Sequence, residues 1–269
     1  MLEGLTKYWG FYLVAVRDVN GVGIRDLHDA LVEVDMYEEW MSDLHLLPPV
    51  QRASQNKVNS LIASKHLQKV LAARIVVFQL FLDLAILVDG NLQEKHKRIW
   101  LLFQLSDGLG GALHPFVRIV RNCLHHASHD ALDILVGRLN NIRDNCLPES
   151  HFIVGLDEAQ HAVRLYRHAF ISSTDNEVFR SIIREMVTVF TKSSIKLVVS
   201  STGLSLDDLT EAVGSGVSKP GVEVFHRLGM FDTWPKLKLF LERYVPASIL
   251  KSHSGSRLQQ RIREYLQGR

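Results

Sequence analysis

The chain has 269 residues, a length that allows one large domain or two small ones. Hydrophobic residues make up 46% of the chain and charged residues 22%, which is ample for a core and ordinary for a soluble globular protein. With 31 Lys and Arg against 29 Asp and Glu, the formal net charge is only +2, and this gives no reason to expect a surface that coats nucleic acid.

The cysteines and the apolar segments favour a soluble intracellular protein, either cytoplasmic or nuclear. The two cysteines, Cys123 and Cys146, can define neither a disulfide framework nor a zinc site. The amino-terminal segment MLEGLTKYWG has no apolar signal-peptide core. The most apolar long window, residues 70–88, contains Arg74 and Asp83, which favours a helix buried in protein rather than in lipid. We therefore expect no membrane contact.

The amino-terminal half begins with a strand pattern and continues with helices. WGFYLVAV, residues 9–16, is almost continuously apolar and predicts a strand covered on both faces, as in a parallel sheet. After a Gly-containing loop at residues 20–23, IRDLHDALVEV has apolar residues at helical spacing. From about Leu61 to Leu139 the pattern is helical, with a break near residues 108–115. This predicts a helical insertion, about 40–147, within or beside the sheet.

The sheet pattern returns after Pro148. Residues 151–156 predict a strand, 178–190 a helix and 195–200 a further strand. Connections of this length imply a right-handed crossover and a parallel sheet. The predicted fold class is α/β, with a sheet core formed by 1–35 and 148–225 and a carboxyl-terminal helical part at 226–269.

The most informative stretch is FIVGLDEAQ, residues 152–160, where a buried strand ends in Asp157 and Glu158. P-loop NTPases end a strand in this way to place a carboxylate that orients Mg²⁺ beside one that activates water. The carboxyl edge of a parallel sheet is also where such sheets bind ligands. We favour this Walker B interpretation over a pair of solvated carboxylates at the end of a strand.

Hydroxyl side chains follow the next predicted strand, at Ser200, Ser201 and Thr202. If the two strands are neighbours, such a residue could sense a γ-phosphate or position the attacking water. Ser and Thr also cap turns and helices well, and the sequence leaves both interpretations open.

No phosphate loop of the form GxxxxGK[ST] is present, because the 269 residues contain no Gly-Lys dipeptide. Three Gly-rich stretches, at residues 20–27, 107–115 and 214–221, are better explained as turns. In the first, NGVGIRDL, Asp26 stands where the third glycine of a dinucleotide fingerprint belongs, and its charge would repel a phosphate.

Three residues, His125, His129 and Asp133, form a possible set of metal ligands. His125 and His129 are four residues apart, with Asp133 a turn further on, so a shared helix face would place them together. No HExxH glutamate accompanies them, and an ordinary helix face is the favoured interpretation.

Several blocks of the chain, taken in order, resemble the P-loop NTPase module of fungal Crinkler-like proteins, within the broader AAA/STAND-type ATPases. The blocks are EGLTKYWGFYLVAVRDVNGVGIRDL, AARIVVFQLFL, KRIWLLFQL, FIVGLDEAQHA, IKLVVSSTGLSL, WPKLKLFLERYVP and RIREYLQGR. The resemblance covers nearly the whole chain and implies an incomplete three-layer P-loop NTPase-like sheet. It also implies Asp157 as the Mg²⁺ ligand, Glu158 as the water-activating residue and Thr202, or Ser201 beside it, as the sensor.

In that family the segment like EGLTKYWGFY directly follows the phosphate loop, so the resemblance implies a truncated or decayed copy. The intact family uses ATP and Mg²⁺, and we expect weak or absent ATP binding by this chain. A sheet without its first strand would also expose an interior edge, through which the chain could associate with itself.

Two alternatives remain. In the first, the fold is a non-enzymatic interaction scaffold for an unknown protein partner, and Asp157 and Glu158 are relics. In the second, suggested by the likeness of DEAQ to a DEAD-type box, the chain is a helicase-like motor. Its near-neutral charge and the lack of a helicase arginine motif disfavour this second alternative.

Overall fold

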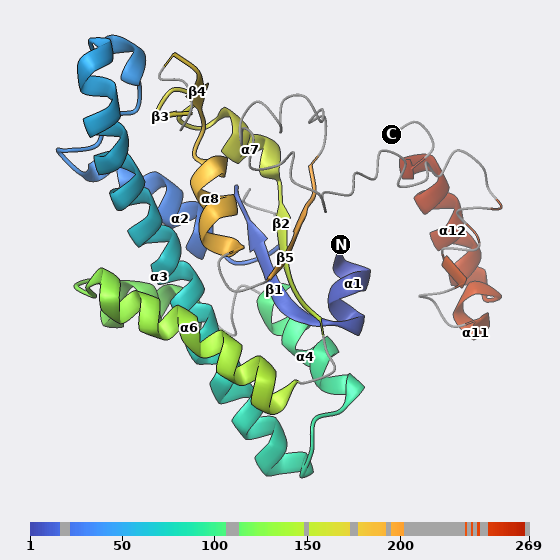
Figure 1. The fold of residues 1–269 in the computed structure, drawn as a ribbon. Helices are drawn as coiled ribbons and strands as arrows, with labels where there is room; N and C mark the ends of the chain where they lie inside the picture. The colour runs from blue at the N-terminus through green and yellow to red at the C-terminus, as the bar shows by residue number, and fades with distance from the viewer. Residues whose placement is uncertain are drawn as a thin grey trace. The chain divides into compact units, whose positions relative to one another are not determined.

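The computed structural model describes residues 1–16, 22–105, 113–147, 151–172, 177–191, 195–201 and 247–266, together with residues 235, 238, 241 and 242. Contacts between residues divide the chain into two compact units, Met1–Pro220 and Gly221–Arg269. The first unit consists of helices packed around a parallel sheet (Figure 1).

The sheet of the first unit has three parallel strands in the order β1-β2-β5. These are β1 (Trp9–Val14), β2 (Phe152–Asp157) and β5 (Lys196–Val199). All six residues of β1 are buried, as expected for an apolar strand covered on both faces. The register pairs Leu13 with Leu156 and Val14 with Asp157, so β1 and β2 end together. The parallel sheet and its three strands, predicted at 9–16, 151–156 and 195–200, are confirmed.

Helices pack on both faces of this sheet. Alternate residues of a strand point to opposite faces, and in β1 both sets are buried. On one side, Tyr12 and Val14 form a small apolar cluster with Leu5 of α1 (Leu2–Lys7) and Leu101 of α4 (Glu94–Leu105). On the other side lies the main core, with edge-to-face and tilted aromatic contacts among Trp9, Phe11, Phe78, Trp100 and Phe152. Trp100 belongs to α4 and reaches this core beyond the edge of β1.

The helices between β1 and β2 begin with α2 (Asp26–Glu33), which precedes the predicted insertion of about 40–147. The others are α3 (Pro49–Asp89), α4, α5 (Pro115–Arg118) and α6 (His129–Cys146), with short 3₁₀ turns at Val34–Met36 and Leu44–Leu46 and a π-helical turn at Ile119–Cys123. Helix α3 begins at Pro49, earlier than the predicted start near Leu61, because proline suits the first turn of a helix. It ends at Asp89, and the following Gly90 has a φ of 75°, the left-handed conformation that glycine adopts readily.

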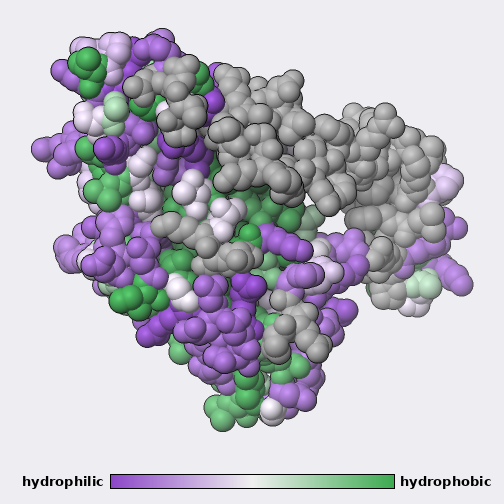
Figure 2. All heavy atoms as spheres, in the orientation of Figure 1, coloured by the Kyte–Doolittle hydropathy of each residue, from purple (hydrophilic) through white to green (hydrophobic). Residues whose placement is uncertain are grey.

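Helix α3 has 41 residues and is long and apolar enough to cross a membrane by length and composition alone, although half of its most apolar window is buried inside the protein. A core helix of a soluble protein passes the same test, so localisation stays a prediction. Arg74 is fully buried, whereas Leu80, Leu84 and Leu87 are exposed. Figure 2 shows apolar residues at the surface towards the lower end of the view, where α3 ends.

The segment between β2 and β5 differs from the prediction of one helix at 178–190. After α7 (Ala159–Arg164), the short strands β3 (Phe170–Ile171) and β4 (Phe179–Arg180) pair antiparallel, and α8 starts only at Ile183 and runs to Phe190. The predicted helix start was wrong because Phe179 and Arg180 form main-chain bonds with β3, a tertiary pairing that overrides a local helical pattern.

The second unit contains α11 (Ala247–Leu250) and α12 (His253–Leu266). The two helices are joined through Ser252, whose hydroxyl accepts a hydrogen bond from the Gly255 N–H at 3.0 Å. Gln259 of α12 donates its side-chain amide back to the Leu250 carbonyl at 2.7 Å. The helical pattern predicted for the last residues of the chain is therefore confirmed over the described part of α12.

Candidate functional site

The predicted site residues that the structure describes lie together at the carboxyl edge of the sheet. Asp157 is the last residue of β2, Glu158 follows it, and Ser201 lies two residues beyond the end of the neighbouring strand β5. The Ser200 N–H donates to the Leu156 carbonyl at 2.8 Å, and the Ala159 N–H donates to the Ser200 carbonyl at 3.2 Å. The two strand ends are thus directly bonded. Thr202 lies outside the described residues.

Both oxygens of the Asp157 carboxylate accept a hydrogen bond. The Tyr12 hydroxyl donates to Oδ2 at 2.6 Å, and the Glu158 N–H donates to Oδ1 at 3.0 Å. Tyr12 stands on β1 opposite Gly155, so it reaches Asp157 diagonally along the same face of the sheet. Burial of Tyr12, followed by the hydrogen bond and the charge of Asp157, raises the pKa of this phenol above its usual value. The Tyr12 hydroxyl therefore stays protonated near neutral pH and can donate its hydrogen bond to Asp157.

Glu158 has a backbone φ of 55°, in the left-handed region that is uncommon for residues other than glycine. Its side chain accepts a hydrogen bond from the Gln160 amide nitrogen, and the Gln160 carbonyl oxygen accepts from the Ser201 hydroxyl at 2.7 Å. Gln160 thus joins the end of β2 to the end of β5. The two carboxylates diverge, with Asp157 towards Tyr12 and Glu158 towards Gln160.

The arrangement suits a hard divalent cation in part. Carboxylate and hydroxyl oxygens are ligands for Mg²⁺, which uses one or two protein carboxylates and completes its shell with water and phosphate oxygens. Among the described residues, no group of three or more His, Cys, Asp or Glu could hold a metal ion. Asp157 and Ser201 could supply one or two oxygen ligands to such a cation, which is fewer than a closed structural zinc site requires.

The free edge of β1 is closed by buried side chains. Gly10 O accepts hydrogen bonds from Trp100 Nε1 at 2.7 Å and from Gln104 Nε2 at 3.2 Å. Gln104 Oε1 accepts from the Tyr12 N–H at 2.9 Å, and Arg74 Nη1 donates to Tyr12 O at 2.8 Å. These bonds occupy the outward Gly10 carbonyl and both outward main-chain groups of Tyr12, so they leave these groups unable to pair with a further strand.

The outer edge of β5 is different. Since the main-chain groups of Ser200 face β2, those of Leu197 and Val199 face outwards. Within the described part of the chain, no residue bonds to these outward N–H and C=O groups. Val198 lies on the same sheet face as Tyr12, which α1 and α4 cover at β1, and it is 39% exposed. The sheet is thus open on the β5 side as far as the described residues show.

The first Gly-rich stretch has a structural role in its described part. Gly23, with a φ of 104°, lies against the Tyr12 ring, and a Cβ atom there would be 3.0 Å from Tyr12 Cε1. Asp26 forms a buried ion pair with Arg74, with distances of 2.8 Å and 2.7 Å. The stretch is therefore part of the core around Tyr12. Residues 107–112 and 214–221 of the other Gly-rich stretches lie outside the described residues.

The histidine group does not share a helix face. His129 is the first residue of α6, and Ser128 caps the helix by accepting from the Ala131 N–H at 3.2 Å, so His125 lies in the preceding turn. Gln68 of α3 joins His129 to Asp133, with contacts of 3.2 Å and 2.8 Å. The prediction that His125 and His129 share one helix was wrong, because Ser128 is the N-cap at which α6 begins.

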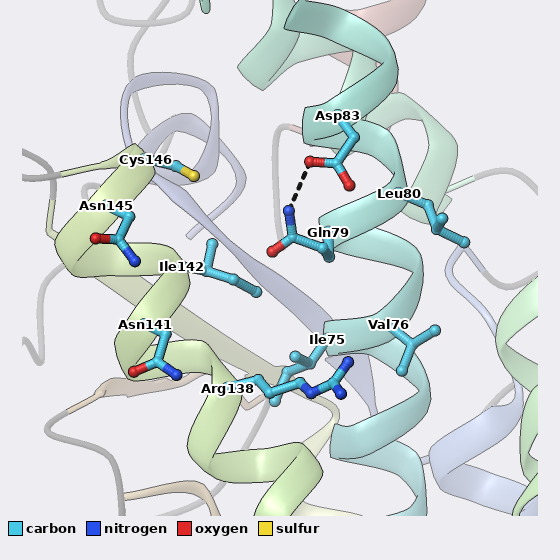
Figure 3. Close-up of a pocket in the computed structure, with 10 residues that line it drawn as sticks. All are labelled: Ile75, Val76, Gln79, Leu80, Asp83, Arg138, Asn141, Ile142, Asn145 and Cys146. Atoms are coloured by element: carbon cyan, nitrogen blue, oxygen red, sulfur yellow. Dashed lines mark hydrogen bonds between the residues drawn. The ribbon is translucent and has the colours of Figure 1, made fainter.

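A cavity of about 520 Å³ opens between α3 and α6 (Figure 3). Its apolar lining includes Ile75 and Ile142, and Gln79 donates a hydrogen bond to Asp83 at 2.7 Å on one wall. No predicted site residue lines it. The cavity also contains no pairing of a nucleophile with a base, so it is not the candidate site.

Sequence reasoning missed Tyr12 and Gln160, which bond to the site residues, and Arg74, which bonds to the Tyr12 carbonyl. The available signal for Tyr12 was a polar tip inside the apolar run WGFYLV, but its partner is 145 residues away in the sequence. Only the sheet register brings the two together.

Comparison with protein-family models, with curated protein sequences and with solved structures finds no significant match.

Proposed function

We propose that the carboxyl edge of β2 and β5 is the cation- and water-orienting half of a nucleotide-hydrolysing site. Asp157 is the cation ligand, Glu158 orients the attacking water, and Ser201, with Thr202 after it, contacts the terminal phosphate. The observation that carries the proposal is the convergence of Asp157, Glu158 and Ser201 at one edge of a parallel sheet. The likeness of the ordered sequence blocks to the P-loop NTPase module of Crinkler-like proteins points the same way.

The layering of helices on both faces of the sheet also supports a P-loop NTPase-like arrangement. A phosphate loop supplies backbone N–H donors, a lysine and one Mg²⁺ ligand, and the 269 residues contain no Gly-Lys dipeptide. Two carboxylates repel a triphosphate unless a cation is held between them. We therefore propose a degenerate switch ATPase half-site that binds Mg·ATP weakly by itself.

Manganese(II), a paramagnetic substitute for Mg²⁺, tests the cation site. We expect one weak Mn²⁺ site by electron paramagnetic resonance, lost in Asp157→Asn and kept in Asp83→Asn. Asp83 is the control because it is an exposed carboxylate on α3, away from the sheet, that accepts a hydrogen bond from Gln79. Binding that is the same in Asp157→Asn as in the parent protein would overturn the proposal.

Calorimetric titration with Mg·ATP tests the degenerate character. We expect binding too weak to saturate at micromolar nucleotide. Micromolar binding that disappears in Asp157→Ala would contradict the degenerate half-site and indicate an intact nucleotide site instead.

A non-enzymatic scaffold is the second candidate, and the asymmetry of the sheet edges favours it. The edge of β1 is closed by Trp100, Gln104 and Arg74, whereas the outward groups of Leu197 and Val199 find no partner among the described residues. An open edge can pair with another strand. In this candidate a second copy of the chain pairs there.

Sedimentation at increasing protein concentration tests self-association. Leu197→Pro removes an outward N–H without touching the bonds to β2, and it should lower the apparent mass at high concentration. Val198→Thr, a change on the same strand that keeps every N–H, is the control. A parent protein that stays monomeric throughout would exclude this candidate.

A further inference from the structure

The Tyr12 hydroxyl is buried against a site residue that comes from a distant part of the chain. The side chain spans diagonally from β1 to the end of β2 and donates to Asp157 Oδ2 at 2.6 Å. Tyr12 is only 3% exposed, so water does not compete freely for the hydroxyl. A hydrogen bond between a hydroxyl and a carboxylate in such surroundings is among the stronger kinds in proteins.

Every polar group of Tyr12 has a partner in the described structure. Gln104 Oε1 accepts from its N–H, Arg74 Nη1 donates to its carbonyl, and Asp157 accepts from its hydroxyl. Gly23 packs against the ring, where a Cβ atom would come within 3.0 Å of Cε1. Tyr12 is thus held at its main chain, along the edge of its ring and at its hydroxyl.

The carboxylate of Asp157 keeps acceptor capacity despite its two bonds. Each carboxylate oxygen has about two acceptor positions. Tyr12 uses one position on Oδ2, and the Glu158 N–H uses one position on Oδ1. One position on each oxygen remains for a cation or its water, and the two existing bonds set the direction in which those positions point.

We propose that Tyr12 is the positioning residue of the candidate cation site, holding the Asp157 carboxylate so that its remaining lone pairs face the carboxyl edge of the sheet. This inference rests on the proposed function of Asp157. Hydrogen-bond partners of metal-ligating carboxylates act in this manner, and their loss typically weakens metal affinity by about 10- to 100-fold. Tyr12 does not touch the cation in this arrangement.

Terbium(III) tests the proposal, because it binds oxygen ligands and its luminescence is sensitised by a nearby tyrosine. We expect a sensitised signal that depends on Asp157 and is lost in Asp157→Asn. In Tyr12→Phe the sensitised emission should fall, and the apparent dissociation constant, followed through direct excitation of terbium, should rise by about 10- to 100-fold. Tyr8→Phe is the matched control, since Tyr8 borders the other end of β1 and is 39% exposed.

The outcomes separate the two proposals. If Asp157→Asn abolishes terbium binding and Tyr12→Phe leaves the affinity unchanged, Tyr12 has no positioning role and the cation site stands. If neither the parent protein nor any variant shows an Asp157-dependent signal, both proposals are wrong. Thermal unfolding of the metal-free Tyr12→Phe protein checks that the loss of affinity occurs in a folded chain.

Discussion

Arg74 and Asp26 form a two-pronged ion pair in the interior of the first unit. Arg74 Nε lies 2.8 Å from Asp26 Oδ2 and Nη2 lies 2.7 Å from Oδ1, and neither side chain is exposed. The guanidinium also lies over the Phe116 ring, 4.5 Å from its centre, and bonds to Tyr12 O and Gln104. The pair therefore joins α2 and α3 to the edge of β1 that supports the candidate site.

Breaking this pair should destabilise the protein strongly. Asp26→Asn keeps the shape of the side chain but leaves Arg74 as an uncompensated buried charge, a change that typically costs about 3–5 kcal/mol. Urea unfolding followed by tryptophan fluorescence measures the change. Arg25→Ala, which breaks the exposed Arg25–Asp29 pair one turn away, is the control and should cost about 0–1 kcal/mol. Equal effects of the two variants would contradict the buried role of Asp26.

Stability should fall as the pH drops below the ordinary range of histidine. His66 of α3 is 5% exposed, and its burial, followed by the charges of Lys69 and Lys65, lowers its pKa from 6.5 to about 4, although Glu33 lies 3.7 Å away. The unfolded chain binds the proton more readily, so stability is full above about pH 6.5 and is lost as the pH falls towards 4.

A shift of this size corresponds to roughly 3 kcal/mol over that window. His66→Gln should flatten the dependence of the unfolding free energy on pH between 4 and 6.5, whereas His126→Gln, in an exposed turn, should not. If the unfolding free energy of His66→Gln still falls between pH 6.5 and 4 as in the parent protein, other groups cause the pH dependence.

Replacing Glu158 with glycine should destabilise the protein less than replacing it with alanine. Both substitutions remove the side chain, but only glycine relieves the cost of a φ of 55°, which is about 1–2 kcal/mol for a residue with a Cβ atom. Thermal unfolding should therefore show Glu158→Gly to be more stable than Glu158→Ala by about 1 kcal/mol. A more stable alanine variant would show that the left-handed conformation is not kept in solution.

The two glycines of the sheet should tolerate alanine unequally. A Cβ atom at Gly10 would collide with the Ile153 main-chain carbonyl of the paired strand, whereas one at Gly155 would meet the flexible Met1 side chain. Gly155→Ala should cost about 1–3 kcal/mol at most, and Gly10→Ala should cost more, because backbone cannot move aside as a side chain can. Chemical unfolding of both variants checks the order, and the reverse order would contradict the register of β1 and β2.

Much of the local structure could be predicted from the sequence. Strands β1, β2 and β5 are short apolar runs that end in turn-forming or polar residues, and α4 matches the predicted EKHKRIWLLFQL segment. The convergence of Asp157 with the end of β5 also followed, since parallel strands that are neighbours end at the same edge. The start of α8 did not follow, because β4 forms only through its pairing with β3.

The sequence by itself determined the period of each apolar pattern, and this indicated the three strands of the parallel sheet and the position of the Asp-Glu pair at a strand end. The tertiary structure alone decided what holds that pair. Tyr12, 145 residues from Asp157, and Arg74, 48 residues from Asp26, act through contacts that depend on register and packing. Local patterns record which face of an element is buried, but they carry no information about which distant polar group meets it there.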